Sequence, residues 1–182
     1  MTGRTPPHWL LFGGLAAAVV AVDQLTKAWI TSAIVPGEVL RVAGDELRLI
    51  ITYNTGGLFG LFRDQAPVFA AFSVGVMVMI VAFHARSPAS RYVSVTLGFL
   101  LGGAVGNFID RVRLGHVIDF VDAGLGTLRF YTFNVADMAV TAAVLMLLML
   151  SIRSSRAGGD VERTIAGGGP AGGKGVDVVH DR

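Results

Sequence analysis

Four long apolar stretches constrain the fold of this 182-residue chain more than any other feature of its sequence. The hydrocarbon core of a bilayer is ~30 Å thick, and a helix needs roughly 20 mostly apolar residues to cross it. The stretches that meet this requirement are Trp9 to Ile30, Ala66 to Phe83, Tyr92 to Ile109 and Phe133 to Ile152. They predict an all-α polytopic membrane protein with four transmembrane helices that alternate in direction.

The composition excludes several other classes of protein. Hydrophobic residues make up 53% of the chain and charged residues only 15%, whereas soluble domains carry about 25% charged residues. The net charge of +2 is too small for a surface that follows the phosphates of a nucleic acid. Because the chain has no cysteine, disulfides, thiolate metal sites and cysteine nucleophiles are excluded as well.

The segments outside the spans predict smaller elements. Glu38 to Asn54 carries β-branched and other apolar residues on both sides of Gly44-Asp45, which predicts a β-hairpin on the membrane surface. Leu128 to Phe133 follows a Gly-rich turn and predicts a second short strand. We expect residues 1–156 to form a four-helix transmembrane domain and residues 157–182 to form a disordered, Gly-rich tail.

The first and third spans carry further signals. The apolar run of the first span continues to Val22, and the other spans need a membrane in any case, so its removal as a signal peptide is the disfavoured alternative.

In the third span, Gly98, Gly102 and Gly106 follow a small-xxx-small spacing. This spacing predicts a face on which a neighbouring helix packs closely.

Polar side chains gather at one side of the predicted bundle. Ionisable residues in membrane spans are costly and mark functional sites by default. Because the four spans alternate in direction, the first and third spans end on the same side of the membrane, and the fourth span begins there. The loop between the first two spans and the loop between the last two lie on that side as well. The polar residues there are Asp23 and Lys27 in the first span, Asn54 and Asp119 in the loops, Asn107, Asp110 and Arg111 at the end of the third span, and Asn134 and Asp137 at the start of the fourth. We expect one site, and the alternative is a polar knot whose members only satisfy one another.

Asp119 and Asp137 are the favoured catalytic pair because each lies among apolar residues. Two carboxyl groups brought together at an apolar interface do not both ionise readily, and a pair that shares one proton can activate water and protonate a leaving group. Asp110 is the weaker candidate because the adjacent Arg111 provides a counter-charge. Arg111 is expected to bind a peptide carbonyl or a lipid head group, and the asparagines to orient the carboxyls or hold substrate backbone.

Other catalytic chemistries lack their sequence signatures. The four histidines are dispersed and no HExxH spacing occurs, so no zinc site is predicted. Neither a GxSxG nucleophile motif nor a GxxxxGK phosphate loop is present. We expect neither a metal nor another cofactor.

Five short segments occur in order along the spans and loops. They are Asp23-Gln24-Leu25-Thr26-Lys27, Asn54-Thr55-Gly56 followed by Phe59-Gly60, Gly102 to Arg111, Val117-Ile118-Asp119-Phe120, and Phe133-Asn134-Val135-Ala136-Asp137. Over about Trp9 to Ile152 the chain thereby resembles the bacterial lipoprotein signal peptidases (signal peptidase II), a family of intramembrane aspartyl proteases. At Gly57-Leu58 it departs from this family, which usually carries alanines there.

The resemblance implies an aspartyl endopeptidase that removes signal peptides from diacylglyceryl-modified prolipoproteins, cutting N-terminal to the lipidated cysteine. It places the catalytic dyad at Asp119 and Asp137. It implies site-supporting or substrate-binding roles for Asp23, Lys27, Asn54, Gly56, Asn107, Asp110, Arg111 and Asn134.

The resemblance also implies a location and a set of partners. The protein is expected in the bacterial cytoplasmic (inner) membrane, with both termini in the cytoplasm and the site at the outer face, where the hairpin would form a small β-cradle. Its expected partners are the lipidated prolipoprotein and membrane lipids, and we expect a monomer.

The residues alone leave orientation and function open. Counted as far as Arg163, arginines outside the predicted helices number six on either side, so the positive-inside rule does not decide the orientation. Membrane carboxylates also form relays in proton- or ion-coupled carriers. A carrier and a non-enzymatic scaffold are therefore the alternatives to the peptidase.

Overall fold

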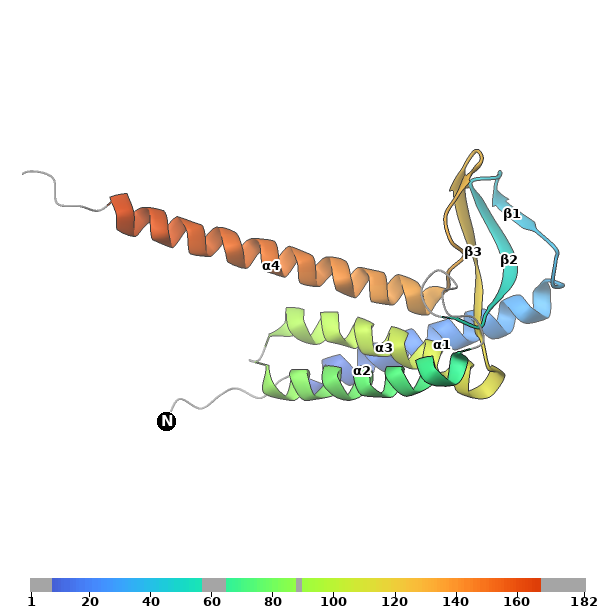
Figure 1. Cartoon of the computed structure of the whole chain (residues 1–182), viewed down its shortest axis with the longest axis horizontal. Coiled ribbons are helices and arrows are strands. Elements are labelled where there is room, and N and C mark those ends of the chain that lie inside the picture. Colours follow the sequence, from blue (N-terminus) through green and yellow to red (C-terminus); the bar gives the residue numbers. More distant parts are fainter. Residues whose placement is uncertain (1–7, 57–64, 88–89, 168–182) are drawn as a thin grey trace, which may run out of the picture. The chain divides into compact units, whose positions relative to one another are not determined.

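The computed structural model describes residues 8–56, 65–87 and 90–167. Its elements follow in the order α1 Trp9–Ala33, β1 Leu40–Ala43, β2 Leu47–Asn54, α2 Ala66–Arg86, α3 Arg91–Leu114, β3 Val117–Leu125, β4 Leu128–Arg129 and α4 Val135–Gly167 (Figure 1). Each helix contains a segment that is long and apolar enough to cross a membrane. The predicted fold class, a polytopic helical membrane protein with a small antiparallel sheet, is confirmed.

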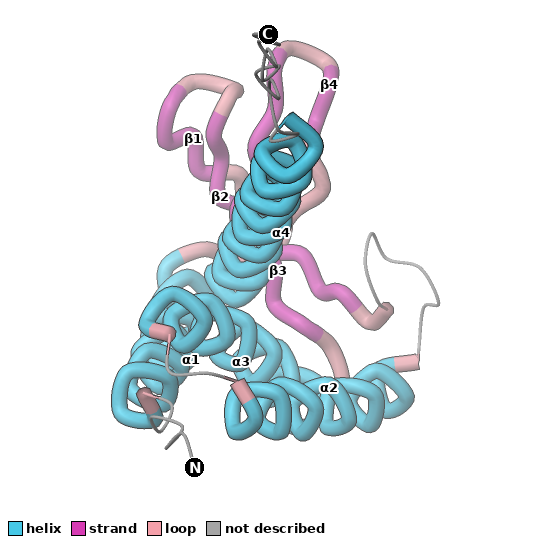
Figure 2. Tube along the Cα trace, turned by 90° about the vertical axis from the view of Figure 1, so that its left-hand side faces the viewer, coloured by secondary structure: helices cyan, strands magenta, loops and turns pink. Residues whose placement is uncertain are grey.

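Helix α3 packs against both α1 and α2 (Figure 2). Its glycine stripe faces α1, where a Cβ at Gly98 would lie 3.0 Å from the carbonyl oxygen of Phe12. A Cβ at Gly102 would lie only 2.6 Å from the Cβ of Val19. Because only glycine permits this approach, the predicted close packing at the small-xxx-small stripe is confirmed.

The outward surfaces of the helices are apolar. Leu10 is 94% exposed and Phe72 is 68% exposed, whereas Asp23 and Lys27 are buried. This distribution is the reverse of that in a soluble protein, because lipid tails are as apolar as the side chains they meet. The exposed faces are therefore suited to contact with lipid.

Helix α3 extends past the residue at which the sequence predicts its end. The charged pair Asp110-Arg111 suggests an end at Ile109, but the helix continues to Leu114. Both charged side chains have partners in the fold, so they do not oppose another helical turn. The helix ends at Gly115, which has a φ of 74° and donates its backbone N–H to the carbonyl oxygen of Arg111, as left-handed C-caps do.

The strands form one antiparallel sheet in the order β1-β2-β3-β4. The hairpin predicted for Glu38 to Asn54 is confirmed as β1 and β2, and Gly44 in its turn has a φ of 56°. The strand predicted for Leu128 to Phe133 is shorter than expected. Only its first two residues form β4, and Phe133 makes an isolated bridge to Val121, because the chain enters α4 directly afterwards.

The main difference from the expectation is that Asp119, which was expected in a loop, lies in strand β3. This strand pairs with β2, so that Asp119 lies opposite Thr52 and Val117 lies opposite Asn54. The two strands are separated by a whole helical hairpin, and pairing with a distant partner leaves no local pattern in the sequence. Asn54 and Asp119 consequently occupy fixed positions on neighbouring strands.

An apolar cluster attaches the sheet to the end of α1. Ile30, Ile34, Ile51 and Phe120 are each at most 8% exposed and pack together. Successive side chains of a strand point to opposite faces. Burial of Phe120 against α1 therefore turns the neighbouring Asp119 to the other face of the sheet.

The C-terminal part of α4 differs from the predicted tail. The chain divides into two compact units at Met146 and Leu147, and the second unit is helical as far as Gly167. The composition predicted a disordered tail from residue 157 onward. Glu162 and Arg163 are good helix formers, and helical hydrogen bonds are local, so a polar segment can continue an existing helix. Residues 168–182 lie outside the described residues.

Candidate active site

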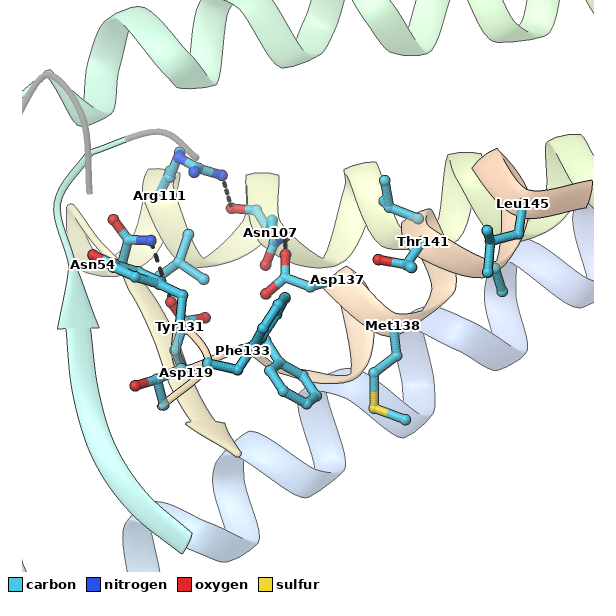
Figure 3. Close-up of a pocket in the computed structure, with 15 residues that line it drawn as sticks. Asn54, Asn107, Arg111, Asp119, Tyr131, Phe133, Asp137, Met138, Thr141 and Leu145 are labelled. Atoms are coloured by element: carbon cyan, nitrogen blue, oxygen red, sulfur yellow. Dashed lines mark hydrogen bonds between the residues drawn. The ribbon is translucent and has the colours of Figure 1, made fainter. Parts of the chain in front are cut away.

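Strand β3 and the first turn of α4 bring Asp119 and Asp137 to the same cavity. The cavity has a volume of about 720 Å³, and its polar lining also includes Asn54, Asn107 and Arg111 (Figure 3). The Asp119 side chain is almost fully buried at 2% exposure. The structure thus brings together the two aspartates that the sequence predicts as a pair.

Asp137 is held at the start of α4 by a reciprocal cap. The side-chain oxygen of Asn134 accepts the backbone N–H of Asp137 at 2.9 Å, and Asp137 Oδ2 accepts the backbone N–H of Asn134 at 3.1 Å. This is the pattern of a capping box, which satisfies N–H groups that the helix leaves unpaired. Asp137 Oδ1 accepts a hydrogen bond from Asn107 Nδ2 at 2.8 Å. Both carboxyl oxygens therefore have a fixed donor.

Asp119 accepts hydrogen bonds from two asparagine side chains. Asn134 Nδ2 donates to Oδ1 at 2.6 Å, and Asn54 Nδ2 donates to Oδ2 at 3.2 Å. The amide of Asn54 is oriented by Gly56, whose backbone N–H donates to Asn54 Oδ1 at 3.1 Å. Asn134 thus contacts both members of the pair, through its side chain and through its backbone.

These surroundings raise the pKa of Asp119 from 3.8 to about 7. Burial is the main cause and the negative charge of Asp137 adds to it, while the hydrogen bonds from Asn54 and Asn134 lower the pKa by a smaller amount. Asp119 therefore holds a proton close to neutral pH. A carboxyl group that keeps its proton beside a second carboxyl can act as a general acid in an acid–base pair.

Arg111 lies on the cavity wall one helical turn beyond Asn107. Its Nη1 donates to the carbonyl oxygen of Asn107 at 3.3 Å, and its Nη2 donates to the carbonyl oxygen of Gly56 at 3.2 Å. The guanidinium lies 5.7 Å from the ring centroid of Phe69. Its Nε is buried without a hydrogen-bond partner among the described residues. The guanidinium therefore links the end of α3 to the segment that follows β2.

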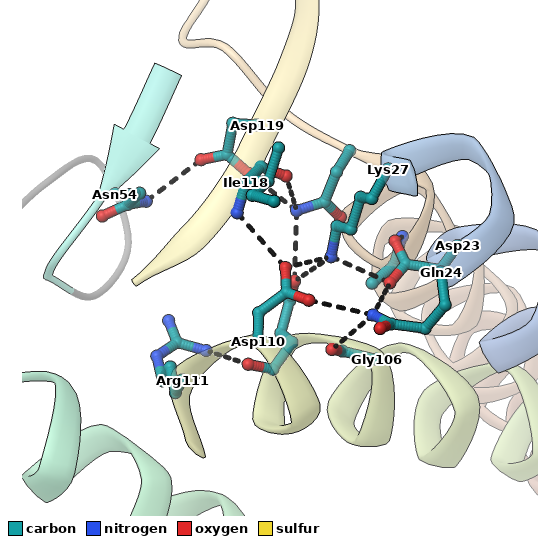
Figure 4. Close-up of polar contacts among 12 residues, drawn as sticks. Asp23, Gln24, Lys27, Asn54, Gly106, Asp110, Arg111, Ile118 and Asp119 are labelled. Carbon is teal, nitrogen blue, oxygen red and sulfur yellow. Dashed lines mark hydrogen bonds and ion pairs between the residues drawn. The ribbon is translucent and has the colours of Figure 1, made fainter. Parts of the chain in front are cut away.

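Lys27 is enclosed by two carboxylates next to this cavity (Figure 4). Its Nζ lies 2.8 Å from Asp23 Oδ2 and 2.8 Å from Asp110 Oδ2. The ion pair of Asp110 is therefore formed with Lys27 and not with the adjacent Arg111, because adjacent residues on a helix do not face each other. Gln24, which was not among the expected site residues, also belongs to the cluster and donates to Asp110 Oδ1 at 2.9 Å.

The cavity has an apolar wall that the sequence does not indicate. The side chains that form it come from β3, from the segment before α4 and from α4 itself: Val117, Phe130, Tyr131, Thr132, Phe133, Met138, Val140, Thr141, Ala142 and Leu145. Met138, Thr141, Ala142 and Leu145 occupy positions i, i+3, i+4 and i+7 and therefore share one helix face. Because residues 138–152 of α4 are apolar on almost every side, the sequence does not show which face borders a cavity.

Two further expectations concern a metal and a substrate loop. Within the described ranges, no group of three or more His, Asp or Glu side chains is placed to hold a metal ion. Gly57 and Leu58, where the chain departs from the pattern it resembles, lie outside the described residues.

Comparison with known families gives one matching model, described as Signal peptidase (SPase) II, over residues 15–153. A protein of Dehalococcoides mccartyi named lipoprotein signal peptidase is 37% identical over 156 residues, which cover 83% of this chain and 94% of that protein. A protein of the same name from Moorella thermoacetica is 40% identical over 135 residues, covering 73% of this chain and 87% of that protein.

Two solved structures described as bacterial membrane enzymes share the fold. One has a TM-score of 0.78 at 26% sequence identity and covers 84% of this chain and 94% of its own. The other has a TM-score of 0.73 at 27% identity and covers 81% of this chain and 96% of its own.

Proposed function

This chain belongs to the signal peptidase II family and is a lipoprotein signal peptidase enzyme, and we propose that Asp119 and Asp137 perform its reaction as an acid–base pair. The proposed substrate is a prolipoprotein whose cysteine carries a diacylglyceryl group, and the proposed cut lies N-terminal to that cysteine. The observation that carries the mechanism is the approach of two hydrogen-bonded carboxyl groups to one cavity.

The proposed reaction begins with a water molecule between the carboxyl groups. Ionised Asp137 accepts a proton from this water, whose oxygen bonds to the scissile carbonyl carbon, while Asp119 donates its proton to the carbonyl oxygen. The resulting diol returns a proton to Asp119 as the carbonyl reforms. Asp137 passes its proton to the leaving nitrogen as the C–N bond breaks, which restores both carboxyl groups.

The assignment of acid and base follows from the surroundings of each carboxyl. Asp119 has a pKa of about 7 and so retains a proton to donate. Asp137 is the partner whose negative charge contributes to the raised pKa of Asp119, so we assign it the role of the base.

The cavity wall supports a substrate with an apolar body. Met138, Thr141 and Leu145 continue the wall along α4, away from the two carboxyls. The hydrophobic segment of a signal peptide and the acyl chains of a diacylglyceryl group both match such a surface. Arg111 also lines the cavity, and its guanidinium is the proposed partner of a substrate carbonyl.

We further propose that the protein acts as a monomer in the bacterial cytoplasmic membrane. In this proposal residues 1–156 form the peptidase domain, both termini lie in the cytoplasm, and the cavity with its β-cradle lies at the outer face. The resemblance of the five sequence segments supports this orientation.

The mechanism is tested by cleavage of a lipidated precursor with purified enzyme. Asp119→Asn and Asp137→Asn should each lower kcat by at least about 10⁴-fold, because neither amide can exchange the required proton. Both variants should still insert and purify like the parent enzyme. Cleavage by either variant at the parental rate would overturn the proposed dyad.

The carrier alternative has a separate test. Proteoliposomes that hold the enzyme should show no proton flux that depends on Asp23 or Asp137. A flux that disappears in Asp137→Asn would favour the carrier. If both aspartate variants alter only thermal stability while cleavage persists, the cluster is a scaffold.

A further inference from the structure

Two aspartates outside the cavity hold the backbone beside the proposed dyad. Asp23 Oδ1 accepts the backbone N–H of Ala136 at 2.9 Å, and Ala136 immediately precedes Asp137. Asp110 Oδ2 accepts the backbone N–H of Ile118 at 3.2 Å, and Ile118 immediately precedes Asp119 (Figure 4). Each buried carboxylate therefore anchors the segment that carries one member of the dyad.

Lys27 joins these two anchors. Its Nζ lies 2.8 Å from an oxygen of Asp23 and 2.8 Å from an oxygen of Asp110, and its side chain is 3% exposed. Two like charges buried this closely repel each other unless a cation lies between them. Lys27 thus connects α1 to both dyad-bearing segments without lining the cavity itself.

Lys27 also orients an amide that contacts the dyad. Its Nζ approaches Asn107 Oδ1 at 3.3 Å, and a lysine ammonium can only donate. The amide oxygen of Asn107 must therefore face Lys27, which leaves Nδ2 to donate to Asp137 Oδ1 at 2.8 Å. Without the ammonium, this orientation would depend on Asn134 Nδ2 alone, which lies 3.1 Å from the same oxygen.

Gly106 of α3 provides the space in which Asp23 approaches the start of α4. A Cβ there would lie 2.7 Å from Asp23 Oδ2 and 3.3 Å from the Cβ of Ala136. The absence of a side chain at this position therefore lets α1 reach the start of α4. Asp23 therefore lies against α3 and also accepts the backbone N–H of the residue that precedes Asp137.

We propose that Lys27 is a positioning residue that sets the spacing of Asp119 and Asp137 by holding Asp23 and Asp110 together. This inference rests on the proposed dyad mechanism. It assigns Lys27 neither a contact with substrate nor a proton transfer, and it predicts that loss of the ammonium lets β3 and the start of α4 move apart.

The first test measures geometry independently of activity. Because the chain contains no cysteine, spin labels can be placed on Leu125→Cys in β3 and Val144→Cys in α4, two positions that are 76% and 45% exposed. In Lys27→Met the distance distribution between the labels should broaden and shift to longer distances. A distribution that stays the same in a folded Lys27→Met protein would overturn the proposal.

The second test separates positioning from substrate binding. With a lipidated precursor, Lys27→Met should lower kcat at least about 100-fold, since misplaced catalytic groups cost this much, while KM stays within about twofold. Ser94→Ala is the matched control, because Ser94 is equally buried but contacts His84 at the other end of the bundle. It should retain the parental kcat and label distances. A Lys27→Met enzyme with parental kcat, or with a change in KM alone, would contradict the inference.

A milder variant keeps the inference testable if Lys27→Met does not fold. Asp110→Asn preserves the shape and an oxygen for the Ile118 N–H but removes the charge that binds Lys27. It should show the same broadening and the same loss of kcat to a smaller degree, and parental behaviour in both would overturn the inference. If the parent enzyme itself cleaves no lipidated precursor, the proposed function fails, whereas the distance measurement still decides the role of Lys27.

Discussion

At the scale of single residues, Asp119 shows how a fold changes the chemistry of a common side chain. Its pKa of about 7 results from burial and from the charge of Asp137, and neither cause belongs to the aspartate itself. As the pH rises through this value the carboxyl loses the proton that the proposed mechanism donates. Activity should therefore fall on the alkaline side as Asp119 ionises.

A change at Asn54 should move this alkaline limb. Asn54 donates to the Asp119 carboxyl and lowers its pKa, so Asn54→Ala should raise that pKa further. The alkaline limb of kcat against pH should move to higher pH, measured by cleavage of a lipidated precursor. Thr127→Ala, in the exposed turn between β3 and β4, is the control and should leave the limb in place. A limb that moves to lower pH in Asn54→Ala would contradict the assignment of Asp119 as the acid.

At the scale of elements, contact between α1 and α3 depends on glycine. A Cβ at Gly102 would lie 2.6 Å from the Cβ of Val19, whereas a Cβ at Gly75 in α2 meets nothing within 4 Å. Gly102→Ala should destabilise the protein by about 1–3 kcal/mol, as overpacking does, and lower the Tm in detergent. Gly75→Ala is the control and should leave the Tm unchanged or raise it, because alanine favours helix. Equal Tm values for the two variants would show that the stripe is not a packing face.

At the same scale, ion pairs of one aspartate connect three strands of the sheet. The carboxylate of Asp122 in β3 lies 2.5 Å from Arg48 Nη2 of β2 and 2.7 Å from Arg129 Nη2 of β4. Burial alone would raise the pKa of Asp122, but hydrogen bonds and charge from both arginines hold it below its usual value of 3.8. The resulting stabilisation is present above pH 3.8 and is lost as the pH falls through the lower folded-state pKa.

Removal of this charge should weaken the sheet. Asp122→Asn should cost about 1–3 kcal/mol at pH 7, seen as faster amide hydrogen exchange in β2 and β3, and the difference from the parent should shrink at low pH. Asp45→Asn is the control, because its pair with Arg41 is about two-thirds exposed and exposed pairs contribute little. Exchange rates that match the parent in Asp122→Asn would rule out a stabilising role.

At the scale of the whole molecule, the orientation of the protein in the membrane can be measured by chemical labelling of single introduced cysteines. The absence of cysteine allows single thiols to be introduced at Thr127, between β3 and β4, and at Arg91, at the start of α3. With the cavity outside, a membrane-impermeant maleimide should label Thr127→Cys in intact spheroplasts, and Arg91→Cys only after permeabilisation. The opposite pattern would invert the proposed topology.

Much of the architecture follows from local sequence. The four spans follow from the length of their apolar runs, and the β1–β2 hairpin from apolar residues on both sides of a glycine turn. The gathering of polar residues at one end follows from alternation of the spans, which needs no knowledge of side-chain contacts. These features depend on the order and the lengths of the apolar runs, which can be read from a sequence and compared with the known thickness of a bilayer.

Other features exist only once distant segments meet. Strand β3 pairs with β2 across a helical hairpin, and Asp110 pairs with Lys27 in place of the adjacent Arg111. One face of the apolar residues 138–152 of α4 borders the cavity. The sequence by itself determined which residues could form a site and at which end of the bundle. Only the tertiary structure decided which side chains pair and how far each carboxyl is buried, because charge pairing and desolvation depend on neighbours in space and not along the chain.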